Sequence, residues 1–135
     1  MAFTTAVRVR FADTDASGRI HFSAMLRYFE AAEQDFLRTF RTHYGDAFRR
    51  GYSFPRVRVE CNYTGAIVAD DLVELTLRVE RIGRSSYTLS FAASVEDRPV
   101  ADGKLVIVCM DLATEKARPL PPEFTALLSQ AAASE

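Results

Sequence analysis

The sequence has few of the residues on which metal sites and disulfide frameworks depend. Its 135 residues include two cysteines, Cys61 and Cys109, and two histidines, His21 and His43. One pair of cysteines makes neither a disulfide framework nor a four-cysteine zinc site, and histidines separated by the length of a helix are poorly placed to share a metal ion. We therefore interpret the cysteines as buried thiols and expect no metal.

Long hydrophobic runs and an excess of positive charge are also missing. No stretch reaches the ~18 to 20 uncharged apolar residues of a membrane-spanning helix, and charged residues from Arg8 to Asp15 interrupt any secretory signal. With 17 Lys and Arg against 18 Asp and Glu, the net charge of −1 gives no general attraction to nucleic acid or anionic lipid. These absences predict a cytoplasmic protein that binds neither nucleic acid nor a membrane.

Three common signature motifs do not occur. The sequence contains no Gly-x-x-x-x-Gly-Lys phosphate loop, no Gly-x-Ser-x-Gly nucleophile elbow and no Gly-x-Gly-x-x-Gly dinucleotide fingerprint. The composition, with 48% hydrophobic and 26% charged residues, is that of an ordinary globular domain. We expect residues 1–135 to form a single domain.

Two kinds of apolar periodicity divide the chain. Helical spacing predicts a long helix of roughly five turns from about Ser23, a plausible N-cap, and a shorter one around Phe124, Leu127 and Leu128. The apolar face of the long helix comprises Met25, Tyr28, Phe29, Ala32, Phe36 and Phe40. Alternation predicts strands at residues 7–11, 57–63, 73–79 and 87–95, and a continuously apolar strand at 105–110 that we expect to be central and covered on both faces.

This order of elements predicts an α+β fold. One strand, a long helix and four further strands with short connections are typical of an antiparallel sheet laid across a helix.

The segment Asp13-Thr14-Asp15-Ala16-Ser17-Gly18 is the most unusual part of the sequence. It places two carboxylates just before a helix N-terminus, where unpaired backbone N–H groups favour anions and polarise carbonyl oxygens. A carboxylate there can cleave an ester as nucleophile or as general base to a water, with an amide near Phe22 stabilising the oxyanion. The alternative is that Asp13 and Asp15 simply cap turns.

His21 and Glu33 are the other titratable candidates. Glu33 falls inside or at the edge of the apolar arc of the long helix, where a carboxylate is costly unless it is paired or hydrated. Either it belongs to a site, or it reaches solvent or pairs with an arginine. His21 is either a general acid or substrate-orienting donor, or a structural or exposed side chain.

A third candidate group lies at a predicted turn. Arg84, Ser85 and Ser86, together with Arg81, can bind the phosphates of a nucleotide-containing substrate. Alternatively they form a solvated hairpin end.

The segment from Phe11 to Phe22, followed by Tyr28-Phe29-Glu30-Ala31-Ala32, resembles the N-terminal signature of the 4-hydroxybenzoyl-CoA thioesterase-like hotdog proteins. The resemblance implies a hotdog fold, in which an antiparallel five-stranded sheet wraps a long helix. It also implies that Asp15 is the catalytic carboxylate, that Asp13 organises the loop and that Gly18 allows the backbone to approach the thioester. The backbone N–H near Phe22 would polarise the thioester carbonyl.

The same resemblance implies an assembly. In this family two protomers pair their sheets and the acyl and pantetheine groups lie between them, so we expect a homo-oligomer, a dimer or a tetramer. Arg84, Ser85 and Ser86 match loosely the region where a partner subunit meets the substrate.

The sequence thus predicts an acyl-CoA thioesterase that needs no cofactor, since a carboxylate, water and oriented amides suffice for hydrolysis. One rival is an acyl-thioester hydratase or dehydratase that uses His21 and Glu33. The other is a protein that binds acyl thioesters without turnover. The residues do not distinguish aromatic from aliphatic acyl groups, or CoA from an acyl-carrier protein.

Overall fold

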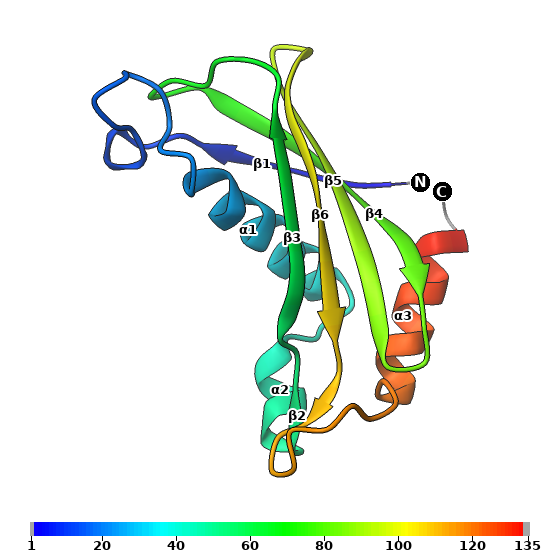
Figure 1. Ribbon diagram of the computed structural model, residues 1–135. Helices are drawn as coiled ribbons and strands as arrows, with labels where there is room; N and C mark the ends of the chain where they lie inside the picture. Colours follow the sequence, from blue (N-terminus) through cyan, green and yellow to red (C-terminus); the bar gives the residue numbers. More distant parts are fainter. Residues whose placement is uncertain (1, 134–135) are drawn as a thin grey trace.

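The computed structural model describes residues 2–133 of the chain. The elements in chain order are β1 (Phe3–Arg8), a 3-10 turn (Phe11–Asp13), α1 (Ala24–Thr39), α2 (Tyr44–Arg49), β2 (Tyr52–Ser53), β3 (Arg56–Tyr63), β4 (Leu72–Ile82), β5 (Ser86–Val95), β6 (Arg98–Val108), β7 (Met110–Asp111) and α3 (Pro122–Ala133). The main sheet is antiparallel in the order β1-β4-β5-β6-β3, and β2 pairs with β7 (Figure 1).

Apolar alternation produces β4 and β5, as the sequence predicts, whereas the alternating apolar residues Val57, Val59 and Tyr63 of β3 are exposed. On β4 the side chains of Val73, Leu75, Leu77 and Val79 are buried, and the residues between them face outward. The same alternation buries one face of β5 from Tyr87 to Val95. One face of the sheet therefore forms the core, and the other is polar.

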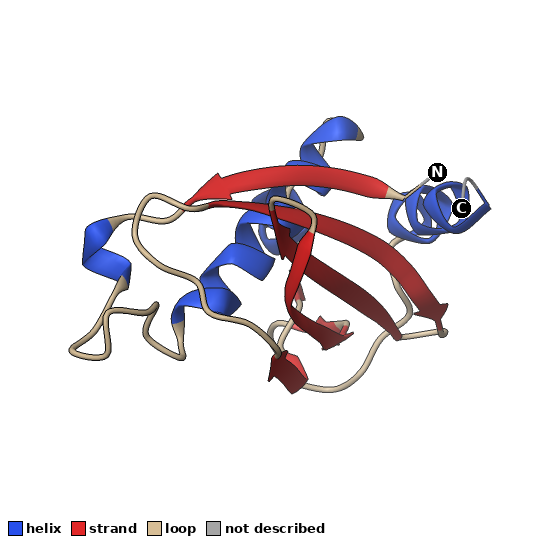
Figure 2. Cartoon of the chain, turned by 90° about the horizontal axis from the view of Figure 1, so that it is seen from above, coloured by secondary structure: helices blue, strands red, loops and turns tan. Residues whose placement is uncertain are grey.

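The long helix α1 lies on the apolar face of this curved sheet, and α3 packs against β4 (Figures 1 and 2). The ring of Phe29 on α1 stacks on Phe91 of β5, with centroids 4.5 Å apart. It also covers Gly103 of β6, where an added Cβ would lie 2.6 Å from that ring and would collide with the backbone oxygen of Glu60. The absence of a side chain at Gly103 lets α1 approach β6 closely. The predicted hotdog arrangement, a long helix on a five-stranded antiparallel sheet, is confirmed.

The first predicted strand is only partly correct. β1 begins at Phe3 and ends at Arg8, and Phe11 is 85% exposed in a 3-10 turn instead of continuing the alternation. The reason is local, because the Asp13 carboxylate accepts a hydrogen bond from the backbone N–H of Arg10 and closes that turn.

The last predicted strand is wrong in both extent and coverage. β6 begins at Arg98, directly after a two-residue turn in which Glu96 and Asp97 have φ of 49° and 62°. It lies beside the edge strand, and the central strand is β5. Val106 and Val108 are half-buried on the polar face, so β6 is covered on one face only.

The helices follow the predicted spacing with two differences. α1 begins one residue after Ser23 and has 16 residues, but the Ser23 side chain makes no capping hydrogen bond. The short helix α2 was not predicted, since its six residues are too few to show a period. The predicted C-terminal helix is confirmed as α3, which buries Phe124, Leu127 and Leu128. No helix within residues 2–133 is both long enough and apolar enough to cross a membrane.

Candidate active site

A tight turn carries the two acidic residues to the start of α1. The backbone N–H of Asp15 donates to the Arg19 oxygen, and the N–H of Gly18 donates to the Asp15 oxygen, each at 3.0 Å. Gly18 has φ of +79°, a conformation that glycine adopts without strain. A Cβ added there would meet no atom within 4 Å. The positive φ of the turn is therefore the reason for a glycine at position 18, and crowding by other residues of the chain is not.

Asp13 fastens this loop to the helix. Its carboxylate accepts hydrogen bonds from the Arg27 guanidinium at 2.5 Å and the Tyr28 hydroxyl at 2.7 Å, and its backbone oxygen accepts from the His21 N–H at 2.7 Å. Partial burial acts to raise the pKa of Asp13, but the bonds from Tyr28 and Arg10 and the charge of Arg27 outweigh it and lower the pKa. All of these bonds join the loop to α1 or to itself, which makes Asp13 an anchor of the loop.

Only one of the two carboxylate oxygens of Asp15 accepts hydrogen bonds from the described residues. Its Oδ1 accepts the Ser17 hydroxyl at 2.6 Å and the Ser17 backbone N–H at 2.8 Å, and these bonds lower the pKa of Asp15. Its Oδ2 has no hydrogen-bond partner within residues 2–133. At neutral pH this side chain therefore carries a negative charge with one oxygen available.

Asp15 and Phe22 line the same pocket. The pocket has a volume of about 230 Å³, and its walls are formed by Asp15, Ser17, Arg19, Ile20, Phe22, Tyr63, Gly65 and Ile67. The loop is joined to its far wall by the hydrogen bond from the Ile20 N–H to the Ile67 oxygen at 2.9 Å. In the part of the chain that the structure describes, the backbone N–H of Phe22 has no acceptor. Two residues with a polar atom unpaired among the described residues, Asp15 with its Oδ2 and Phe22 with its N–H, therefore line one small cavity.

His21 is tied to the helix start instead of to another titratable group. The Ser23 N–H donates to its Nδ1 at 3.2 Å, and the Ser23 hydroxyl lies 2.8 Å from the same nitrogen. Because a backbone amide can only donate, this nitrogen is the unprotonated one when the bond forms. His21 is exposed and its ring lies against that of Phe22, with centroids 4.4 Å apart and the ring planes tilted by 31°.

Glu33 lies in a separate buried network. It is 1% exposed, and its carboxylate pairs with the Arg56 guanidinium at 2.5 Å and accepts a hydrogen bond from the Tyr44 hydroxyl. The Tyr44 hydroxyl also bonds to that of Tyr87. Glu33 thus pairs with an arginine, one of the two readings open from the sequence, and the structure does not bring it together with His21.

Burial dominates the electrostatics of this network. It raises the pKa of Glu33 against the opposing influence of the Arg56 charge and the Tyr44 bond, and it raises those of Tyr44 and Tyr87. Burial acts to lower the pKa of Arg56, but the Glu33 charge together with Tyr44 and Tyr87 outweighs this effect and raises it. Arg56 therefore stays charged.

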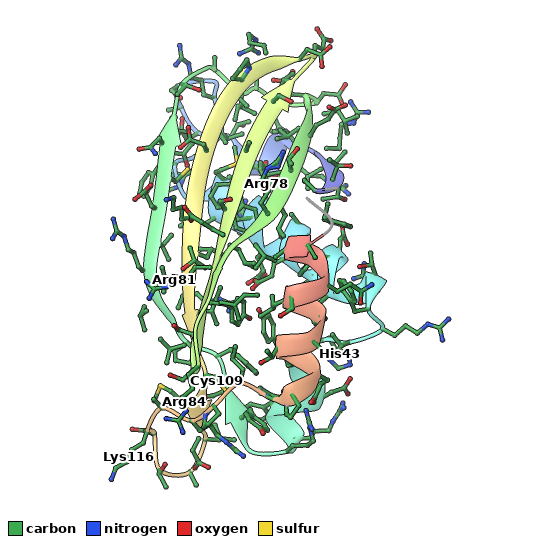
Figure 3. All side chains as sticks on the ribbon, turned by 90° about the vertical axis from the view of Figure 1, so that its right-hand side faces the viewer. His43, Arg78, Arg81, Arg84, Cys109 and Lys116 are labelled. Atoms are coloured by element: carbon green, nitrogen blue, oxygen red, sulfur yellow. The ribbon has the colours of Figure 1, made fainter. Side chains whose placement is uncertain are left out.

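The predicted phosphate-binding group lies far from the Asp15 loop within one chain. Arg84, Ser85 and Ser86 form the β4–β5 turn, at the end of the sheet opposite the loop, and Arg84 lies beside Cys109 (Figures 1 and 3). The backbone oxygen of Ser85 accepts from the Cys109 N–H at 2.7 Å, and that of Arg84 accepts from the Leu120 N–H at 2.9 Å.

Two residues that shape the site, Ser17 and Tyr63, were not among the predicted site residues. Ser17 stands inside the predicted motif, and its Asx-turn position, two residues after Asp15, was the available signal. Tyr63 lies 41 residues from Phe22, yet its hydroxyl donates a hydrogen bond to the Phe22 oxygen. No local pattern indicates that contact.

Among residues 2–133 no group of three or more His, Cys, Asp or Glu side chains is arranged to hold a metal ion. The fold and this loop together define a class, a hotdog protein with an ionised carboxylate and an open amide donor at the start of its long helix.

Comparison with known proteins identifies the family. Residues 9–128 match the thioesterase-like superfamily, so the chain belongs to it, and it is a thioester hydrolase. It is 28% identical over 117 residues to a 1,4-dihydroxy-2-naphthoyl-CoA hydrolase of Synechococcus elongatus, covering 84% of this chain and 85% of that protein. It is also 28% identical over 132 residues to the long-chain acyl-CoA thioesterase FadM of Escherichia coli, covering 93% and 96%.

Comparison with solved structures finds the same fold. The structure of Slr0204, a 1,4-dihydroxy-2-naphthoyl-CoA thioesterase from Synechocystis, matches with a TM-score of 0.90 at 20% identity and covers 96% of each chain.

Proposed function

We propose that the protein hydrolyses an acyl-CoA thioester to a free acid and CoA in the pocket that Asp15 and Phe22 share. The observation that carries the proposal is the pairing of a carboxylate oxygen and a backbone N–H, both without partners in the described chain, in the wall of one cavity. This is the combination that thioester hydrolysis requires, because a nucleophile or base must act while the carbonyl oxygen gains charge.

Asp15 acts in one of two ways. As nucleophile, its free oxygen attacks the thioester carbon, the C–S bond breaks, CoA leaves as the thiolate, and water then cleaves the resulting anhydride to regenerate the carboxylate. As general base, it takes a proton from the water that attacks the same carbon. Both routes need an ionised carboxylate, and the low pKa of Asp15 supports both.

The backbone N–H of Phe22 stabilises the oxyanion. It lies two residues before the start of α1, so the positive end of the helix dipole adds to the attraction. A donor fixed in place before the reaction can contribute roughly 10²- to 10³-fold to kcat. Asp13 and the Gly18 turn hold the loop that carries this pair of groups.

The substrate class follows from the relatives. One is named for a bicyclic aromatic acyl-CoA and another for long-chain acyl-CoA, so CoA thioesters are the common feature of their names. The apolar walls of the pocket, Ile20, Phe22 and Ile67, suit a hydrocarbon acyl group of either kind.

We also infer a homodimer, which pairs further into a tetramer in the arrangement the family resemblance implies. β3 lies at the edge of the sheet, so one side of its backbone has no strand partner within residues 2–133. Exposed apolar side chains gather on this strand and at the start of α1: Phe22, Leu26, Val57, Val59 and Tyr63. An exposed edge with an apolar face favours pairing with a second copy. Antiparallel pairing of the two β3 strands brings the opposite end of the partner, with its Arg84, Ser85 and Ser86, toward the Asp15 loop.

The test is release of free thiol from a panel of aromatic and aliphatic acyl-CoAs. We expect Asp15→Asn to lose at least roughly 10²-fold in kcat, as the loss of a catalytic carboxylate predicts. Asp97→Asn is the matched control, because Asp97 lies at the tip of the β5–β6 turn with φ of 62°, a conformation that asparagine tolerates. Normal activity in Asp15→Asn would refute the proposed chemistry.

The rival activities give different results in the same assay. A hydratase that uses His21 and Glu33 would release no thiol, because hydration leaves the C–S bond intact. Its hydration of an unsaturated acyl-CoA, followed separately, would survive Asp15→Asn and be lost in His21→Ala. The structure holds these two side chains in separate hydrogen-bond networks, which does not favour this reading. Saturable acyl-CoA binding without turnover on the whole panel would indicate a binding protein.

A further inference from the structure

Tyr63 connects the edge strand of the sheet to the backbone of Phe22, a residue that lines the pocket. It is the last residue of β3, and its hydroxyl donates a hydrogen bond to the backbone oxygen of Phe22. Phe22 precedes the N-cap residue Ser23, so the helical ladder of α1 supplies no donor to this carbonyl. The phenol of Tyr63 satisfies a group that the helix leaves open.

The dipeptide His21-Phe22 is therefore held at both ends. At one end the His21 N–H donates to the Asp13 oxygen at 2.7 Å, and at the other the Phe22 oxygen accepts from Tyr63. The Phe22 N–H lies between these two fixed points. The peptide that carries this N–H is itself held by its other group, because the His21 oxygen accepts from the Ala24 N–H at 2.9 Å. The Tyr63 bond restrains the peptide that follows it.

We propose that Tyr63 is a positioning residue that fixes the direction of the Phe22 N–H toward the thioester oxygen. The inference rests on the proposed function, because it assigns a purpose to the oxyanion donor named there. Tyr63 acts through the backbone, since a phenol has one hydrogen and the Phe22 carbonyl accepts it, with the Cys61 thiol as a further neighbour of the hydroxyl.

The surroundings of Tyr63 support a fixed role. The two residues that follow it are pinned to β6, because the N–H groups of Thr64 and Gly65 both donate to the Val100 oxygen, at 2.9 and 3.1 Å. A Cβ added at Gly65 would lie 2.9 Å from the mobile end of the Arg98 side chain and 3.1 Å from the Pro99 oxygen, so the backbone here packs closely against β6. Burial raises the pKa of Tyr63, so the hydroxyl keeps its proton in ordinary assay buffers.

The experiment compares Tyr63→Phe with wild type and with Tyr52→Phe. The change removes one oxygen and keeps the ring, so the wall of the pocket is preserved. Tyr52 lies in β2, at the other end of the molecule from the loop, and controls for the loss of a phenol (Figure 1). We expect kcat to fall about tenfold with KM nearly unchanged, a part of the effect of losing an oxyanion donor altogether.

Two further readouts separate positioning from other roles. The ¹H–¹⁵N signal of the Phe22 amide should shift in Tyr63→Phe and stay in place in Tyr52→Phe, whether or not the enzyme turns over. The shape of the pH profile of kcat should not change, because Tyr63 does not titrate in the reaction.

The proposal is overturned by an unchanged kcat, by a rise in KM alone, which would make Tyr63 a substrate contact, or by a Phe22 amide signal that does not move. A loss of activity that merely follows dissociation of the dimer in size-exclusion chromatography would also overturn it. Failure of the proposed function is a separate result, because then wild type itself releases no thiol or Asp15→Asn remains active.

Discussion

Replacement of Arg56 by methionine should cost much more stability than the same replacement at a surface arginine. The Arg56 guanidinium lies 2.5 Å from the Glu33 carboxylate, and the two side chains are 26% and 1% exposed. Methionine keeps much of the volume and removes the charge. Glu33 would then be a buried carboxylate whose remaining partner is the Tyr44 hydroxyl.

The size of the loss follows from burial. Removing one partner of a buried ion pair costs about 3 to 5 kcal/mol, and the partial exposure of Arg56 and the Tyr44 bond favour the lower figure, about 3 kcal/mol. An unfolding entropy of about 2.1 cal/mol/K per residue gives about 0.28 kcal/mol/K for 135 residues. The Tm should therefore fall by about 10 °C.

The loss should also depend on pH. Burial already raises the pKa of Glu33, and removing the Arg56 charge raises it further. When the pKa of a carboxyl group is higher in the folded than in the unfolded protein, its protonated form favours folding. Its contribution to the free energy of unfolding is fully present below the unfolded-state pKa and is lost as the pH rises through the folded-state pKa. The destabilisation by Arg56→Met should therefore be smaller at pH 5 than at pH 8.

Thermal unfolding followed by circular dichroism at both pH values measures these effects. Arg38→Met is the control, because Arg38 pairs with Asp35 at 2.7 Å but is 72% exposed, and such surface pairs contribute about 0 to 1 kcal/mol. Adding Glu33→Gln to Arg56→Met should restore most of the loss by removing the unpaired charge. Equal losses for Arg56→Met and Arg38→Met, or a loss independent of pH, would refute the reasoning.

Three further substitutions probe the site, the core and the assembly. Ser17→Ala removes a hydrogen bond that lowers the pKa of Asp15, so the acidic limb of the kcat/KM profile should move to higher pH; an unmoved limb contradicts this. Gly103→Ala forces a methyl group toward the Phe29 ring and should lower stability by about 1 to 3 kcal/mol in urea unfolding, whereas unchanged stability would show that the helix can move away. Val59→Lys places a charge on the exposed face of β3 and should convert the dimer to monomers in light scattering, and a persistent dimer would locate the interface elsewhere.

The spacing of apolar residues predicted most of the helices and strands because each of these elements buries one face. The alternation at 73–79 and the helical spacing from Met25 to Phe36 each describe a face that is buried in the structure. The errors occur where a side chain or a turn overrides the pattern. Asp13 ends the first strand before Phe11, and the turn at Glu96-Asp97 lets β6 begin at Arg98.

In the candidate site, too, residues with local contacts were predicted and the partners in distant contacts were not. Spacing along the chain was enough to select the segment from Asp13 to Gly18, because the bonds of Asp15 and Gly18 are local, although Asp13 also bonds to Arg27 and Tyr28 of α1. The partners of Glu33 and Phe22 come from β3, 23 and 41 residues further along, and local sequence carries no record of such contacts.

The hydrogen bond from Tyr63 of β3 to the Phe22 backbone links the Asp15 loop to a late step of folding. β3 has one neighbour in the sheet, β6, which is paired through residues 101–107. During synthesis the wall that Tyr63 supplies therefore has no support until most of the chain has left the ribosome, and such distant pairings form late. If the proposed roles of Asp15 and Tyr63 hold, thioester cleavage requires the completed sheet, and a shortened chain with the Asp15 loop intact should be inactive.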